Sequence, residues 1–209
     1  MGLELVLILI LFLSLVILGS SRLGVMIQLF ALQSFILSLT PLWIHPGLHA
    51  VVLMTITLIL KVILMPVLLF WAIRHVSIRR EVKPFLGYGM TWILGGFLTG
   101  AAFLISSKLD LPTKAISGLL IPSAFSIVMI GFLILVSRLT AIIQVIGYLV
   151  MENGIFLFGL LLLEKTPLLV EMGITLDIFV GVLVMGIVVY HINQEFGSAS
   201  TIHLTGLRD

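Results

Sequence analysis

Three ionisable side chains lie inside long apolar stretches of this sequence and are its candidates for chemistry: Lys61, Glu152 and Asp177. An ionisable group near the centre of a bilayer costs at least ~2.5–3.5 kcal/mol on insertion scales, so it persists where it has partners, water or a proton to carry. An ammonium and two carboxylates can all exchange protons, which is the chemistry of a proton path or of an ion-coupled transporter. We therefore predict that these three residues form part of a proton path.

A structural interpretation of the same residues stays open. Lys61 could pair with Glu152 or with Asp177, and the charges would then only hold neighbouring helices together. We favour the functional interpretation because ionisable residues inside membrane spans most often mark ion or proton pathways.

The surroundings of Glu152 predict a polar seam on one helix. Gln144, Tyr148 and Glu152 recur at four-residue spacing, so they stack on one helix face, and Tyr148 joins the predicted proton path. Asn153 adds an amide beside the carboxylate. The same stretch carries three residues small enough to let another helix approach closely: Gly147, Gly154 and Gly159.

The surroundings of Lys61 and Asp177 add further polar groups. Pro66 has no backbone N–H, so the Val62 carbonyl loses its helical partner close to the ammonium, which predicts a broken or hydrated helix segment. His191 follows Asp177 by two seven-residue steps and is predicted to share its helix face, so we include it in the path.

No cofactor or metal site is predicted. His45 and His49 are four residues apart, but Pro46 and Gly47 disfavour a continuous helix there and no carboxylate lies nearby. The chain has no Cys, which excludes disulfides, thiolate chemistry and cysteine-ligated iron–sulfur clusters. It also lacks phosphate-binding and dinucleotide-binding glycine motifs. Any redox or ATP chemistry coupled to this protein is therefore expected on another subunit.

Composition predicts an all-α polytopic membrane protein. Of 209 residues, 61% are hydrophobic and 10% are charged, with a mean hydropathy of +1.33. The positive net charge would suggest nucleic acid in a soluble protein, but here the basic residues lie in loops. Apolar runs long enough to cross a bilayer predict about seven transmembrane helices, at residues 3–18, 23–44, 48–73, 85–106, 115–136, 144–163 and 168–191.

Two regions are expected: a four-helix region over residues 1–110 and a three-helix region over residues 111–209. No internal repeat is recognisable, which disfavours a stand-alone solute carrier. The basic loop residues predict the orientation. An outside N-terminus and a cytoplasmic C-terminus place seven of them in the cytoplasm and three outside, in agreement with the positive-inside rule. The seven are Arg22, Arg74, Arg79, Arg80, Lys83, Arg138 and Arg208, and the three are Lys108, Lys114 and Lys165.

Residues 145–159, VIGYLVMENGIFLFG, resemble the hydrogenase-4 component E family, a membrane subunit of formate hydrogenlyase-like complexes. Residues 115–192 are also similar to the small three-helix subunit shared by respiratory complex I and Mrp-type sodium/proton antiporters. In that subunit the third helix carries an acid four residues before a glycine, as Asp177 and Gly181 do here. The acid of its second helix would fall at Leu149, whereas this chain has Glu152 one turn later, which favours the hydrogenase-4 branch.

The resemblance implies partners and a location. It implies antiporter-like and proton-channel subunits in the inner membrane of a prokaryote, and a cytoplasmic arm of nickel–iron hydrogenase-like and iron–sulfur subunits. This chain would be a membrane subunit of that oxidoreductase, without catalysis of its own. The alternatives are a Mrp-like antiporter assembly lacking a redox arm and a purely structural membrane subunit.

Overall fold

The computed structural model describes residues 2–44, 47–75, 87–108, 118–162, 179–182, 184, 186 and 190, and all of its regular structure there is helical. The elements are α1 (Gly2–Gly19), α2 (Leu23–Ser38), α3 (Thr40–Ile44), α4 (Leu48–Thr57), the π-helix η1 (Leu58–Leu64), α5 (Met65–His75), α6 (Tyr88–Lys108), α7 (Leu120–Ser137) and α8 (Ala141–Leu162).

Six stretches of these helices are long and apolar enough to cross a membrane, which confirms the predicted all-α polytopic membrane protein. They contain 18 to 25 residues. At about 1.5 Å per residue they are roughly 27–38 Å long, which is comparable to the roughly 30 Å thickness of a hydrocarbon core. The second stretch, Leu23–Ile44, has the bounds expected from the sequence, and the others differ by a few residues at their ends. The seventh predicted span, residues 168–191, lies largely outside the described residues.

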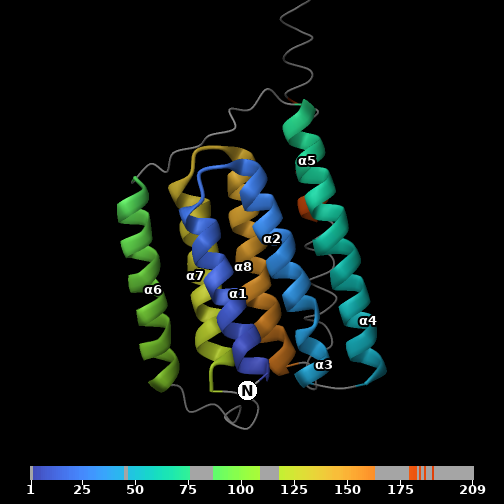
Figure 1. Cartoon of the computed structure of the whole chain (residues 1–209), viewed down its shortest axis with the longest axis vertical. Coiled ribbons are helices and arrows are strands. Elements are labelled where there is room, and N and C mark those ends of the chain that lie inside the picture. The colour runs from blue at the N-terminus through green and yellow to red at the C-terminus, as the bar shows by residue number, and fades with distance from the viewer. Residues whose placement is uncertain are drawn as a thin grey trace, which may run out of the picture.

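The helices run roughly along a common direction as one bundle (Figure 1). Helices α1, α2, α7 and α8 form its centre, through contacts of α1 with α2 and α7, and of α8 with α2 and α7. The α4–η1–α5 segment packs against α2 on one side, and α6 packs against α7 and α1 on the other (Figure 1). One hydrophobic core therefore joins helices from both predicted regions, with Ile10, Phe30, Ile130 and Ile146 among its fully buried members.

Helices α7 and α8 pack so closely that glycine is required between them. A Cβ atom on Gly147 would lie 2.7 Å from the Leu135 backbone nitrogen, and one on Gly154 would lie 2.8 Å from the Val128 nitrogen. These distances are far below van der Waals contact, so any larger residue would separate the helices. The predicted close approach is thus confirmed at Gly147 and Gly154, whereas nothing lies within 4 Å of a Cβ on Gly159.

Candidate functional site

Lys61 is carried into the protein interior by the π-helix. The helix does not break at Pro66, as one reading of the sequence suggested, but widens over Leu58–Leu64, where the Met65 N–H bonds the Leu60 carbonyl five residues back. Pro66 has no N–H to donate to the preceding turn, and a π-turn is one way for the helix to continue without that hydrogen bond. Lys61 is 3% exposed, whereas its neighbour Ile63 faces outward. The wide turn therefore presents Lys61 alone to the bundle interior.

Glu152 lies near the middle of α8 on the face turned into the bundle. Leu149, Val150 and Asn153 around it are fully buried, and Glu152 itself is 2% exposed. The glycine contacts between α7 and α8 lie directly beside it, at Gly147 and Gly154. The carboxylate is therefore enclosed by protein, as expected for an ionisable group at this depth.

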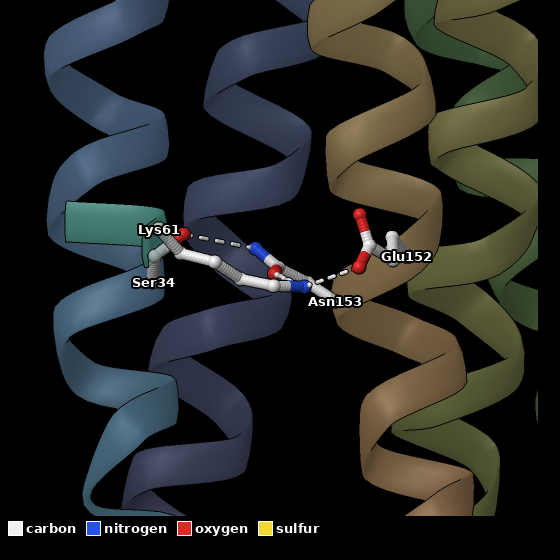
Figure 2. A network of polar contacts seen from close by, with 4 residues as sticks. All are labelled: Ser34, Lys61, Glu152 and Asn153. Carbon is white, nitrogen blue, oxygen red and sulfur yellow. Dashed lines mark hydrogen bonds and ion pairs between the residues drawn. The ribbon is translucent and has the colours of Figure 1, made fainter. Parts of the chain in front are cut away.

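The two charges meet in a buried ion pair. The Lys61 Nζ atom lies 3.0 Å from Glu152 Oε1, with each side chain 3% exposed. Lys61 Nζ also donates to the Asn153 Oδ1 atom at 3.4 Å, and Asn153 Nδ2 donates to the Ser34 Oγ atom at 3.2 Å. Figure 2 shows these four side chains converging from α2, η1 and α8. The structure therefore pairs Lys61 with Glu152, one of the two partners that the sequence left open.

An aromatic ring adds a further contact to the ammonium. Lys61 Nζ lies 5.9 Å from the centroid of the Phe156 ring, one turn after Glu152, within the range of a cation–π interaction. The ammonium therefore contacts a carboxylate, an amide oxygen and an aromatic face. Only the carboxylate among these can change its charge by binding a proton.

A buried pair of this kind is poorly explained by stability alone. Burying two charges costs several kcal/mol per ion before their mutual attraction is counted, and apolar replacements of such pairs are often neutral or stabilising. The same arrangement is suited to proton exchange. Transfer of one proton from the ammonium to the carboxylate converts the ion pair into a neutral amine and a neutral acid. The geometry thus permits both interpretations drawn from the sequence, a proton path and a structural ion pair.

A second polar contact lies next to the ion pair on α2. Gln33 Nε2 donates to the Ser14 Oγ atom of α1 at 2.7 Å, and the Ser14 hydroxyl donates to the Ile10 carbonyl at 3.0 Å. Gln33 and Ser34 are adjacent and fully buried, so α2 bonds through them to α1 on one side and to α8 on the other. The position of these neutral residues beside the charges could not be read from the sequence.

The other predicted site residues have different outcomes. Tyr148 is half-buried one turn before Glu152 and lines a cavity of about 210 Å³ between α7, α8 and residues 179–180. Gln144 lines the same cavity, whereas Glu152, the third residue of the predicted seam, is not among its lining residues. Asp177 and His191 lie outside the described residues, as do His45 and the side chain of His49. Within the ranges that the structure describes, no group of three or more His, Cys, Asp or Glu residues could hold a metal ion.

Arg138 is a buried residue whose role the sequence did not indicate. It lies in the turn between α7 and α8, where a basic loop residue was expected, yet its side chain is fully buried. Its Nη2 atom donates to the Leu18 carbonyl at 2.9 Å and to the Ser20 carbonyl at 3.3 Å, at the end of α1. The guanidinium also lies 5.5 Å from the Tyr88 ring centroid. Burial lowers the pKa of Arg138 from its ordinary value, and Tyr88 acts in the opposite direction.

Comparison with known proteins gives significant similarity to a small set of bacterial proteins. The chain is 31% identical over 153 residues to an uncharacterized protein, Rv0085, of Mycobacterium tuberculosis, which covers 73% of this chain and 70% of that one. It is 29% identical over 150 residues to hydrogenase-4 component E of Escherichia coli (strain K12), covering 72% and 69% of the two chains. Hydrogenase-4 component E of Shigella flexneri matches to the same extent. No family model and no solved structure matches the chain.

Proposed function

Because this chain belongs to the hydrogenase-4 component E family, we propose that it is a membrane subunit of an energy-converting hydrogenase or complex I-like redox complex. In this proposal Lys61 and Glu152 take part in proton translocation, coupled to electron transfer in other subunits. The observation that carries the proposal is the ion pair of 3.0 Å between two membrane-spanning segments, with both side chains 3% exposed. Neither charge reaches an aqueous surface of this subunit, so a proton that reached them would have to come through the protein.

The partners follow from the same family. Electron transfer needs redox centres, and a chain without Cys cannot supply thiolate ligands to an iron–sulfur cluster. We therefore place those centres in hydrogenase-like and iron–sulfur subunits of a cytoplasmic arm. In the inner membrane of a prokaryote, antiporter-like and proton-channel subunits would continue the proton path. Tyr148, Asp177 and His191 remain candidates for its neighbouring steps.

The orientation is part of the proposal. Arg22, Arg74 and Arg138 all lie at one end of the bundle, because α1, α5 and α7 end there, and Lys108 ends α6 at the opposite end (Figure 1). The positive-inside rule then favours a cytoplasmic location for the end with Arg22, and an N-terminus on the outside.

A structural role is the second candidate, and the closed geometry of the site favours it specifically. The contacts of Ser34, Lys61, Glu152 and Asn153 join α2, η1 and α8 within one subunit, as an internal brace would. A Mrp-like antiporter assembly is the alternative of the same functional type. The proteins that co-purify with the native complex separate the two, since an antiporter assembly would contain no redox arm.

Proton translocation by the assembled complex tests the relay. We would compare Glu152→Gln, Lys61→Met and the double variant in inverted membrane vesicles, and measure proton uptake together with electron transfer. The double variant removes both charges, so it leaves no uncompensated buried ion and should assemble best. A relay predicts that all three variants lose most of the proton uptake while electron transfer continues.

The matched control is Glu4→Gln, the same change at an exposed carboxylate in the first turn of α1. It should translocate protons like the wild type. Full proton uptake by an assembled double variant would sink the relay and leave the structural role. If the single variants fail to assemble and the double variant assembles, then the unpaired buried charge, and not the missing relay, caused the failure.

A further inference from the structure

We propose that Asn153 and Ser34 are positioning residues for this ion pair: the Asn153 carbonyl holds the Lys61 ammonium while Glu152 carries a proton, and Ser34 anchors the Asn153 amide. The inference rests on the proposed function and concerns the residues that position its ion pair. Its starting point is the pair of acceptors around Lys61 Nζ, Glu152 Oε1 at 3.0 Å and Asn153 Oδ1 at 3.4 Å.

The orientation of the Asn153 amide follows from its neighbours. An ammonium has three donors and no acceptor, so the amide must turn its oxygen towards Lys61. Its NH₂ group then points to Ser34, whose oxygen accepts at 3.2 Å. Ser34 and Asn153 are both fully buried, so no solvent competes for these bonds. Without the Ser34 hydroxyl, the buried NH₂ group would lose its acceptor and the amide its anchor.

A second acceptor matters because Glu152 becomes neutral when it binds a proton. Protonation of Glu152 removes the negative charge beside the Lys61 ammonium, which makes the burial of that positive charge more costly. Asn153 Oδ1 and the Phe156 ring do not titrate, so their interaction with the ammonium persists in both states of Glu152. Asn153 therefore makes it easier for Glu152 to bind a proton while Lys61 stays in place.

Other described charges are placed too far along the helices to take this role. Glu4, Arg22, Arg74 and Lys108 lie in the terminal turns or flanks of their helices, and Arg138 lies in the turn between α7 and α8. The buried polar residues Gln33 and Ser34 of α2, and Ser123 and Ser126 of α7, are uncharged. In the part of the chain that the structure describes, Lys61 and Glu152 are thus the charged groups of this layer.

The test follows the protonation of Glu152 in the purified complex by infrared difference spectroscopy. The carbonyl band of the protonated acid is assigned by its loss in Glu152→Gln and is then followed as a function of pH. In Asn153→Leu, which keeps the side-chain shape, we expect the band to require a roughly tenfold or higher proton concentration, the fold-change for one lost hydrogen bond to a charged group. Ser34→Ala should shift the band in the same direction by a smaller factor, and Ser34→Thr should restore it.

Ser126→Ala is the matched control. Ser126 is as buried as Ser34, but its hydroxyl bonds the Pro122 carbonyl of its own helix at 2.7 Å. In Ser126→Ala, the Glu152 band should depend on pH as it does in the wild type. An unchanged titration in both Asn153→Leu and Ser34→Ala would overturn the positioning role, as would an equal shift in Ser126→Ala.

The outcome is separable from that of the proposed function. If Glu152→Gln translocates protons normally, the relay is wrong, but the titration still shows whether Asn153 controls the charge of Glu152. If Glu152→Gln is inactive and the titrations do not move, the relay stands and the positioning role alone is lost. Ser34→Ala serves where Asn153→Leu prevents folding, because it removes only the hydroxyl that accepts from Asn153 Nδ2 and leaves the Asn153 side chain in place.

Discussion

The Arg138 guanidinium, in the turn between α7 and α8, donates to the Leu18 carbonyl at the end of α1 over 2.9 Å, although 120 positions separate the two residues. The last carbonyls of a helix lack partners within the helix, and a cation at that end also interacts favourably with the helix dipole. Arg138 therefore connects α1 to the turn between α7 and α8.

Arg138→Met should destabilise the protein by about 3 kcal/mol, because two hydrogen bonds from a charged donor are lost and the Leu18 and Ser20 carbonyls lose a partner. Arg138→Lys should recover only part of this, because a single ammonium cannot reproduce the planar fork. The measurement is the thermal unfolding midpoint of the detergent-solubilised protein. Arg22→Met, at an exposed arginine at the same end of the bundle, should leave the midpoint nearly unchanged.

Gly154→Ala should separate α7 from α8, because the new methyl group would lie 2.8 Å from the Val128 nitrogen and 2.9 Å from the Ala124 oxygen. The expected cost is about 1–3 kcal/mol, typical of overpacking in a tight contact. Gly159→Ala is the control on the same helix, since nothing lies within 4 Å of its added carbon. Equal unfolding midpoints for the two variants would show that the close approach at Gly154 is not required.

Pro66→Ala should shift Lys61 out of the ion pair. With an N–H at position 66, the Val62 carbonyl regains a donor and the segment can return from π-helix to α-helix, which turns Lys61 by about 100° for one residue of register. Proton uptake should fall while the complex remains assembled. Val67→Ala, at an exposed neighbouring position, should have no effect on uptake. Wild-type proton uptake by Pro66→Ala would show that the proposed relay does not require the π-helix.

The orientation can be tested with single cysteines, since the chain has none of its own. Ser21 and Gly47 are both exposed and lie at opposite ends of the bundle, one on each side of the α2–α3 span. With the N-terminus outside, an impermeant thiol reagent added to intact cells should label Gly47→Cys, and should label Ser21→Cys only after the membrane is opened. The reverse pattern would invert the topology.

The sequence alone identified the six spans of the described helices, and the charges of Lys61 and Glu152 within them, because both are local properties. Leu23–Ile44 is recognisable as a span from its length and hydropathy, whatever packs beside it. Lys61 and Glu152 stand out because a charge within an apolar run is costly in any membrane fold. The glycines of α8 could be recognised as a close-packing set for the same reason, but not which of them meet a neighbouring backbone.

Tertiary structure decided which of these groups meet. Lys61 pairs with Glu152, 91 positions away, and Ser34 reaches Asn153 because α2, η1 and α8 are neighbours in the bundle. No spacing along the chain encodes those contacts, since they depend on which helices pack together and on the rotation that η1 imposes on Lys61. Arg138 illustrates the same limit. The sequence predicts an exposed basic residue in a turn, yet Arg138 is buried against the end of α1. There it donates to the Leu18 carbonyl, which lacks a partner within its own helix.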